Sequence, residues 1–125
     1  MTTMTAMTTS PPTAHGQELQ ETISEAMVEL YNQHFPAPVS MAETFLNKDL
    51  VCCVLEGIFD AHEQERIERG DEQAVLDERH ALQQQVRPQL VAAVEHATER
   101  RVVAFMSANH GDPALAAELF VLEPR

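Results

Sequence analysis

The segment that most constrains the fold is residues 50–55, LVCCVL, an unbroken apolar run. A short run rich in valine and leucine predicts a β-strand, which we place at residues 50–59. Because the apolar residues do not alternate with polar ones, both faces of this strand should be covered. Asn47-Lys48-Asp49 is a short polar connection, so residues 39–46 should form the first strand of a hairpin. Gly57 falls late in the run, where a bulge or a close backbone approach is common.

A helix is expected before this hairpin. Apolar residues recur three and four positions apart over residues 17–34, and the four glutamates of this segment lie away from most of that stripe. This pattern predicts an amphipathic helix with an acidic outer side. The segment Phe35-Pro36-Ala37-Pro38 should end it, because a residue that precedes proline avoids the helical region.

Two more helices are expected after the hairpin, over residues 60–70 and 72–98. Asp60 and Glu63 have the spacing of a capping box. Gly70 suits the position just after a helix end. Pro88 lies inside the second helix, where it should kink or interrupt it, because proline lacks the amide donor.

The C-terminal part predicts strands again, at residues 101–107 and 115–122, with a turn at residues 109–113. Leucine and alanine also make residues 115–122 compatible with a helix, but the length and the Phe-Val pair favour a strand. The element order is therefore α-β-β-α-α-β-β. It predicts an α+β fold with a four-stranded, mainly antiparallel sheet and helices packed on one face.

A length of 125 residues suits one domain. Residues 1–16 are rich in threonine, methionine and proline and should form a disordered tail. Residues 17–125 should form a single α+β domain. A chain that begins near residue 16 should keep its thermal stability.

Charge excludes several classes of partner. The chain has twenty acidic and eight basic residues, for a net charge of −12. Binding to nucleic acid or to anionic lipid needs lysine and arginine, so neither is expected. No apolar run approaches the roughly 20 residues that span a bilayer, so direct membrane insertion is not expected, and the N-terminus lacks a signal peptide. Cys52 and Cys53 are adjacent and should stay reduced, which favours a cytoplasmic location.

An ordered set of short segments resembles the MpsC-like family, named for a component associated with a Na⁺-translocating, membrane-potential-generating system. The resemblance covers residues 18–124. It is carried by LEGIFDAHE at residues 55–63, Arg79 and Arg87, EHAT at 95–98, VAFMS at 103–107, His110 with Asp112, and FVL at 120–122. The sequence departs from the family at Phe59-Asp60, in place of Leu-Thr, and at Thr98-Glu99, in place of Thr-Gly, which removes an expected glycine C-cap. The family name implies an accessory role beside a membrane transporter.

Candidate ligand-binding residues are Arg79, Arg87, His110 and Asp112. The two arginines are about two helical turns apart, near one face, and could hold an anion such as bicarbonate, given the transport association of the family. The alternative is that they form salt bridges with the plentiful carboxylates. His110 and Asp112 lie in a polar turn, which is either a functional loop or a plain connection.

No catalytic residue, metal site or cofactor is expected. The histidines show neither HxxH nor HExxH spacing, and a metal site needs three or four convergent ligands. Glu43 and Glu56 are charged residues in predicted strands. They would serve a paired-carboxylate enzyme only if one of them had a raised pKa in a pocket.

The apolar strands predict self-association. Three helices cover about one face of a four-stranded sheet, so a second copy of the chain should cover the other. We expect a homodimer with Val54, Leu119 and Val121 in the interface.

The leading hypothesis is a non-enzymatic soluble accessory domain that regulates a cation- or bicarbonate-linked membrane system, with a membrane-transport protein as a partner. The alternatives are an anion or small-ligand sensor that binds between the long helix and the sheet and, less favoured, a small hydrolase.

Overall fold

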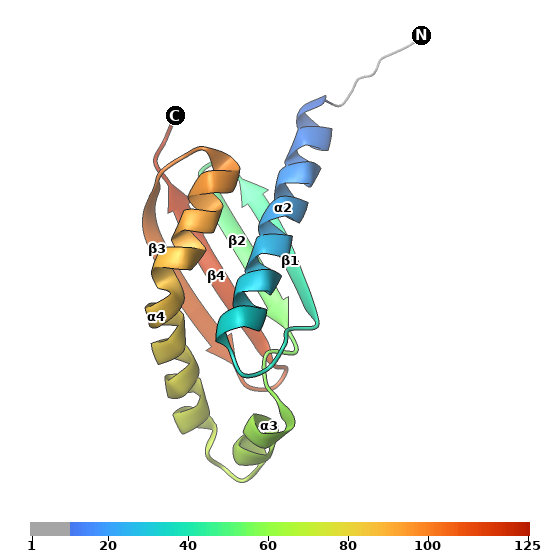
Figure 1. Cartoon of the computed structure of the whole chain (residues 1–125), viewed down its shortest axis with the longest axis vertical. Helices are drawn as coiled ribbons and strands as arrows, with labels where there is room; N and C mark the ends of the chain where they lie inside the picture. Colours follow the sequence, from blue (N-terminus) through green and yellow to red (C-terminus); the bar gives the residue numbers. More distant parts are fainter. Residues whose placement is uncertain (1–10) are drawn as a thin grey trace.

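The computed structural model describes residues 11–125, with side chains from residue 16 onward. The order α-β-β-α-α-β-β and the α+β class are confirmed (Figure 1). The elements are α2 (Pro11–His34), β1 (Met41–Asn47), β2 (Leu50–Glu56), α3 (Ala61–Glu68), α4 (Glu72–Thr98), β3 (Val102–His110) and β4 (Leu115–Leu122).

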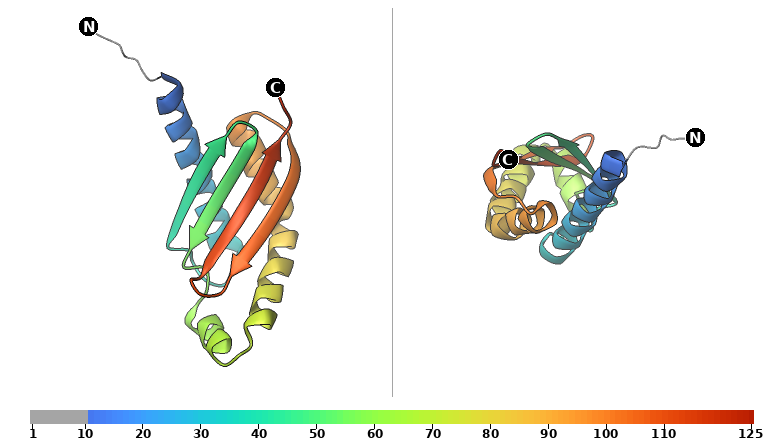
Figure 2. Two further views of the ribbon diagram at one scale, coloured as in Figure 1. Left: turned by 180° about the vertical axis from the view of Figure 1, so that it is seen from behind. Right: turned by 90° about the horizontal axis from the view of Figure 1, so that it is seen from above.

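The four strands form one sheet in the order β1-β2-β4-β3, and every neighbouring pair is antiparallel. Helices α2 and α4 lie side by side across one face of this sheet, and α3 caps one end (Figure 1). Seen from behind, the sheet lies in front of the helices, and no described part of the chain covers it (Figure 2). The expectation that helices pack on one face is therefore confirmed.

Two elements match their predicted bounds, and others shift for local reasons. Helix α4 and strand β4 occupy residues 72–98 and 115–122 as expected. Strand β2 ends at Glu56, earlier than predicted, because Gly57 has a positive φ of 70°. A Cβ atom at Gly57 would lie 2.5 Å from the Ser40 hydroxyl oxygen, which confirms the close backbone approach expected there.

Strand β3 continues to His110, so the connection to β4 is shorter than the predicted turn. The side chain of Asn109 bonds to Gln83 of α4, and this contact helps to hold the end of the strand against the helix. At the other terminus, α2 already begins at Pro11, earlier than the expected start at residue 17. Of the predicted tail, residues 1–10 lie outside the described part of the chain.

Pro88 does not interrupt α4, which is continuous from Glu72 to Thr98. Of the two effects expected of Pro88, a kink or an interruption, the interruption does not occur. Proline frees the carbonyl one turn earlier, at Gln84. Both residues are exposed, so water can hydrate the freed carbonyl and the cost of the missing bond is reduced.

The start of α3 carries the expected cap and the end of α4 carries one with a substitution, but Asp71, at the cap position before α4, makes no side-chain cap hydrogen bond. The Asp60 side chain accepts from the Glu63 amide at 2.8 Å and the Glu63 side chain accepts from the Asp60 amide at 3.0 Å, which confirms the capping box. At the end of α4, Glu99 adopts the left-handed conformation with a φ of 56°. A glycine normally occupies this position, so the left-handed backbone of Glu99 has a conformational cost that glycine would avoid.

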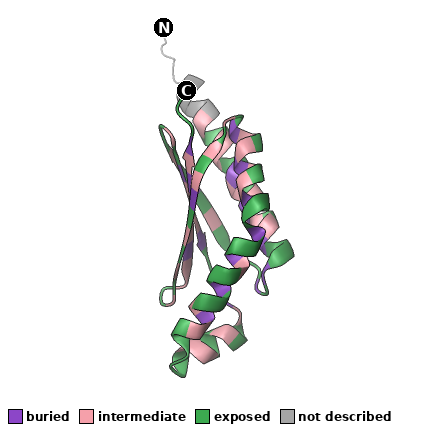
Figure 3. Cartoon of the chain, turned by 90° about the vertical axis from the view of Figure 1, so that its left-hand side faces the viewer, coloured by how far each residue is buried: buried purple, intermediate pink, exposed green. Residues whose placement is uncertain are grey.

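The core lies between the helices and the inner face of the sheet (Figure 3). Its largest fully buried apolar side chains come from α2, β2, β4, α4 and the segment after β2: Tyr31, Phe120, Ile23, Met27, Leu55, Ile58 and Leu90. The opposite face of the sheet takes no part in this core.

Candidate functional site

The uncovered side of the sheet, which we call the open face, follows from the alternation of side chains along each strand. In β4, four residues point into the core and are buried, and the four between them point outward and are half-buried. The outward residues of β4 are Leu115, Ala117, Leu119 and Val121. The strand therefore carries apolar residues on both sides although the chain covers only one.

Large apolar side chains gather on the strands of this sheet. In the described part of the chain, five large hydrophobic residues are exposed, and all five belong to the sheet: Met41, Phe45, Leu50, Val103 and Met106. Phe45 is 48% exposed and Met106 is 50% exposed. The pairing register aligns them across the strands in a row of four, Phe45–Cys52–Leu119–Met106, through the middle of the open face.

The rows beside it differ between the two halves of the open face. The row next to the central one is Glu43–Val54–Ala117–Ala108, and the row after that is Met41–Glu56–Leu115–His110. Both carboxylates thus lie on the half made by β1 and β2. In these two rows the half made by β4 and β3 carries two alanines, one leucine and one histidine, and no carboxylate.

All three residues predicted for a dimer interface, Val54, Leu119 and Val121, lie on the open face and are half-buried. Leu119 belongs to the central row. Glu43 and Glu56 are exposed on the same face. This exposure gives neither carboxylate the enclosed, water-poor surroundings that an acid catalyst needs.

The inner side of the same sheet holds a buried polar cluster built on Glu118, which is 0% exposed. Its carboxylate accepts hydrogen bonds from the hydroxyls of Tyr31 and Ser107, and from the Gln83 amide nitrogen at 3.1 Å. Gln83 also exchanges hydrogen bonds with Asn109, at 2.8 and 3.1 Å. The cluster thus joins α2, α4, β3 and β4 at one point.

Burial dominates the acid–base behaviour of this cluster. Removal from water raises the pKa of Glu118 above its ordinary value, although the hydrogen bonds from Ser107, Tyr31 and Gln83 oppose the rise. Burial and the neighbouring carboxylate raise the pKa of Tyr31 as well. Chemically, Glu118 could hold or release a proton, but the core encloses it and a substrate cannot reach it without opening the fold.

The cluster was not anticipated from the sequence, yet a signal was present. Residues 115–122, LAAELFVL, contain a single charged residue, Glu118, in a strand predicted to be covered on both faces. A charge in such a strand must be buried, and a buried carboxylate needs partners. The partners themselves come from distant helices and could not be read from spacing.

Arg79, one of the predicted anion ligands, is buried at 2% exposure. It donates to the Ile58 carbonyl oxygen, lies 3.6 Å from the Glu63 carboxylate, and stacks over the rings of Phe35 and Phe59 at 4.8 and 5.4 Å. Burial lowers the pKa of this guanidinium and Glu63 opposes the shift. Its second terminal nitrogen, Nη1, is buried without a hydrogen-bond partner among the described residues.

The other predicted ligands have different surroundings. Arg87 is exposed, with its guanidinium 5.5 Å from the centre of the Phe105 ring. His110 ends β3 and bonds through Nδ1 to the Pro113 carbonyl at 2.9 Å. Asp112 lines a small hollow beside α3. Each residue makes its contacts separately, so the structure assembles no common site from the four.

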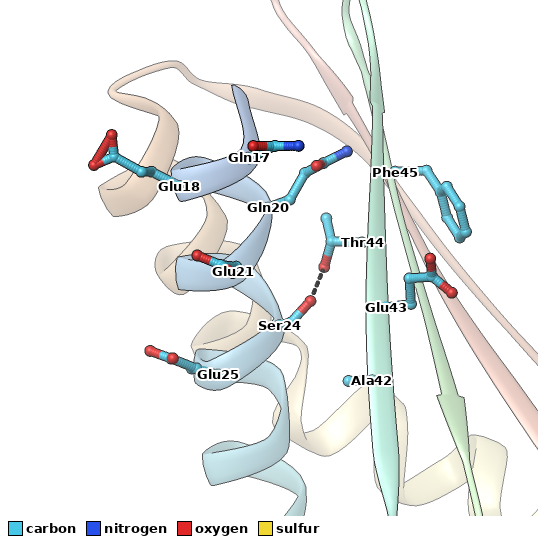
Figure 4. A pocket seen from close by; sticks show the side chains of 10 residues that line it. All are labelled: Gln17, Glu18, Gln20, Glu21, Ser24, Glu25, Ala42, Glu43, Thr44 and Phe45. Carbon is cyan, nitrogen blue, oxygen red and sulfur yellow. Dashed lines mark hydrogen bonds between the residues drawn. The ribbon is translucent and has the colours of Figure 1, made fainter. Parts of the chain in front are cut away.

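A groove runs between α2 and β1. Its broader end has a volume of about 720 Å³ and is lined by Gln17, Glu18, Gln20, Glu21, Ser24, Glu25, Ala42, Glu43, Thr44 and Phe45 (Figure 4). The hydroxyls of Ser24 and Thr44, 2.7 Å apart, join the two elements at its inner end. A second hollow continues it along the same two elements and shares Ser24, Glu25 and Ala42.

The described residues form neither a metal-binding cluster nor a membrane span. Among them, no three His, Cys, Asp or Glu side chains are placed to hold a metal ion. No helix in that part of the chain combines the length and the apolar composition needed to cross a bilayer.

Comparison with known proteins relates the chain to a family. The family model described as "Na+-translocating membrane potential-generating system (MpsC)" matches residues 15–123. This span contains all four strands together with α3 and α4, and nearly all of the described chain. No curated protein and no solved structure gives a significant match.

Proposed function

The chain belongs to the MpsC family, and from this premise we propose that it is a non-enzymatic accessory domain of a Na⁺-linked membrane-potential system, active as a homodimer joined through its open face. The observation that carries this proposal is the set of exposed apolar side chains on a sheet that helices cover on one side only. A monomer rarely leaves so many large apolar residues together in water.

A second copy fits the open face better than an unrelated surface does, because the face is self-complementary. A two-fold axis parallel to the strands would place β1 of one copy over β3 of the other. The row Phe45–Cys52–Leu119–Met106 would then lie over the same row reversed, so that Phe45 faces the Met106 of the second copy. The neighbouring row would place Glu43 over Ala108, which pairs a large side chain with a small one.

The charges support the same axis. Since Glu43 and Glu56 both lie on the β1–β2 half, this arrangement sets each of them against the uncharged half of the other copy. An axis perpendicular to the strands would instead stack β1 on β1 and bring the carboxylates of both copies together, at an electrostatic cost.

The size of the open face predicts a concentration-dependent dimer. Four strands about 4.8 Å apart and seven residues rising about 3.3 Å each span roughly 19 by 23 Å. This is at the small end of protein interfaces, where about 800 Å² per partner is ordinary. Dissociation in the micromolar range is therefore expected.

Two further parts of the proposal have separate support. A non-enzymatic role is supported by the enclosure of Glu118 and Tyr31, the groups with the most perturbed environments, in the core. A cytoplasmic location is supported by two free cysteines, Cys52 and Cys53, which a reducing compartment would preserve.

A mixing experiment tests the dimer and its axis together. Phe45→Glu and Met106→Lys should each give a monomer, because each puts an unpaired charge into the interface. An equal mixture of the two variants should dimerise, since Glu at 45 would then face Lys at 106 of the other copy. Within one chain these positions are about 14 Å apart, across three strand spacings, and cannot pair. Light scattering measures the mass in each case.

The control is Gln84→Lys, a charge added at an exposed site on α4, which should leave the dimer intact. If the mixture stays monomeric while both variants are folded, the axis is wrong. If Met106→Lys alone dimerises as well as the unchanged protein, the open face is not the interface.

A further inference from the structure

Strand β1 leaves one edge of the sheet free. Within the described residues it pairs with β2 alone. The two-residue turn Lys48-Asp49 makes Asn47 and Leu50 a hydrogen-bonded pair. By alternation, the backbone groups of Met41, Glu43 and Phe45 face β2. Those of Ala42, Thr44 and Leu46 therefore point away from the sheet, toward whatever lies beside it.

The groove between α2 and β1 runs along this free edge. Its helical wall carries four glutamates three or four residues apart, all of them exposed: Glu18, Glu21, Glu25 and Glu29. In Figure 4 Gln20 and Ser24 extend from α2 toward β1, and the side chains of Glu18 and Glu25 point to the outer side of the helix. Among the described residues, no lysine or arginine lines either hollow of the groove.

We propose that this groove binds an extended, basic segment of a partner protein, which adds to β1 as a fifth strand. The free backbone groups of Ala42, Thr44 and Leu46 would pair with the segment. Its side chains that face the helix would meet the glutamates of α2, so every second residue should be lysine or arginine. Its other side chains would continue the open face beyond Met41 and Phe45, so they should be apolar.

Charge decides against a second copy as the occupant of this groove. Strand β1, MAETFLN, carries one charge and it is negative. Pairing β1 with β1 would also bring two glutamate-lined helices close together, and like charges repel. Charge repulsion therefore disfavours pairing of this edge with a second copy, and charge attraction favours pairing with a basic strand.

The proposed accessory role supplies a natural source for such a segment. Lysine and arginine concentrate on the cytoplasmic loops next to the spans of membrane proteins. The inference rests on that role only for the existence of a partner. Glu43 and Phe45 belong to both the groove and the open face, but the free backbone edge of β1 lies outside the proposed dimer interface. A monomer that binds the peptide described below would refute the dimer and leave this proposal standing.

A labelled peptide of about eight residues, an ordinary strand length, in which lysine alternates with valine, is the probe. Fluorescence anisotropy should show saturable binding to the full chain, and the same peptide with glutamate for lysine should not bind. Hydrogen exchange should slow at the amides of Ala42, Thr44 and Leu46. Binding without protection of these amides would overturn the proposal.

Backbone methylation separates strand pairing from charge attraction. The test assumes that the segment runs antiparallel to β1, as all neighbouring strands of this sheet do. Residues that pair across two antiparallel strands have side chains on the same face, so the lysines are the residues whose amides would bond to β1. Methylating the lysine amide nitrogens should abolish binding, and methylating the valine amide nitrogens should not. Equal binding of both methylated peptides would overturn the proposal.

Two double variants test the glutamate wall. Glu21→Lys with Glu25→Lys should weaken peptide binding at least about tenfold, because two attractions become repulsions. Glu65→Lys with Glu68→Lys makes the same change of net charge on the exposed side of α3 and should weaken it less than about threefold. Equal losses in the two would show that only net charge matters and would overturn the proposal.

Discussion

The Tyr31 hydroxyl donates a hydrogen bond to the Glu118 carboxylate, and so joins α2 to the centre of β4. Both residues are fully buried, at 0% exposure. Strand β4 is also paired on both sides, to β2 and β3. This one contact therefore ties the first described helix to the last strand at the point where the core is least apolar.

Replacing Glu118 by Gln should make the protein less sensitive to pH. The folded state raises the pKa of Glu118, so its protonated form fits the fold better than its ionised form does. Its contribution to stability is full below about pH 4, the ordinary range of a glutamic acid. It is lost as pH rises through the higher folded pKa.

Denaturant unfolding of both proteins between about pH 4 and pH 8 checks this. The stability of Glu118→Gln minus that of the unchanged protein should increase steadily with pH, since the amide cannot ionise. A difference that is constant, or that falls with pH, would mean that the carboxylate is ionised without penalty.

Arg79→Met should lower the free energy of unfolding by about 1–3 kcal/mol, because it leaves the buried Ile58 carbonyl without a donor. Arg87→Met is the matched control, at an exposed position in the same helix. It should cost no more than about 1 kcal/mol, the value of an exposed cation–π contact. Urea midpoints measure both changes. Equal losses would contradict the structural role given to Arg79.

Glu99→Gly should stabilise the protein by about 0.5–1 kcal/mol, since glycine adopts the left-handed conformation of this C-cap without the cost that a side chain incurs. Gln85→Gly, at an exposed position inside α4, should instead destabilise it by about 1 kcal/mol. Thermal unfolding distinguishes them. A loss of stability in Glu99→Gly would mean that the Glu99 side chain contributes more than its backbone costs.

The two adjacent cysteines should react very differently with iodoacetamide. Cys53 is buried and its pKa is raised by that burial to about 11, so little of the reactive thiolate exists near neutral pH. Cys52 lies half-buried in the central row of the open face. Native protein should be alkylated once, at Cys52, as mass spectrometry would show.

The rate of that alkylation reports on the dimer. Because the second copy would cover Cys52, the rate should fall as the protein concentration rises. The monomeric variant Met106→Lys provides the control, and its rate should not depend on concentration. A rate that is independent of concentration in the unchanged protein as well would argue that the open face stays uncovered.

Local signals predicted the elements well, because local physics determines them. The capping box of Asp60 and Glu63 set the start of α3, and Gly57 ended β2 through its positive φ. The same local reasoning allowed an interruption at Pro88, which does not occur, because sequence spacing does not show that the position is exposed to water. The end of β3 depends on the tertiary contact between Asn109 and Gln83. No local sequence pattern predicts a boundary of this kind.

The candidate surfaces were less predictable than the fold. The apolar content of β2 and β4 indicated a second covered face, and the structure places Leu119 on it. The strand order, which aligns Phe45 with Met106 across four strands, is a property of the whole sheet and has no signature in either segment. The sequence suggested Arg79 as an anion ligand because it could not show that this side chain is buried. The burial depends on Phe35 and Phe59, which lie far from Arg79 in the chain.

The central claim is that the open face joins two copies of this chain, and the mass of the unchanged protein in solution tests it most directly. Light scattering should give a mass that rises with concentration through the micromolar range, from 13.9 kDa toward twice that value. A mass that stays at the monomer value up to about 1 mM, where even weak interfaces of this size associate, would contradict the account.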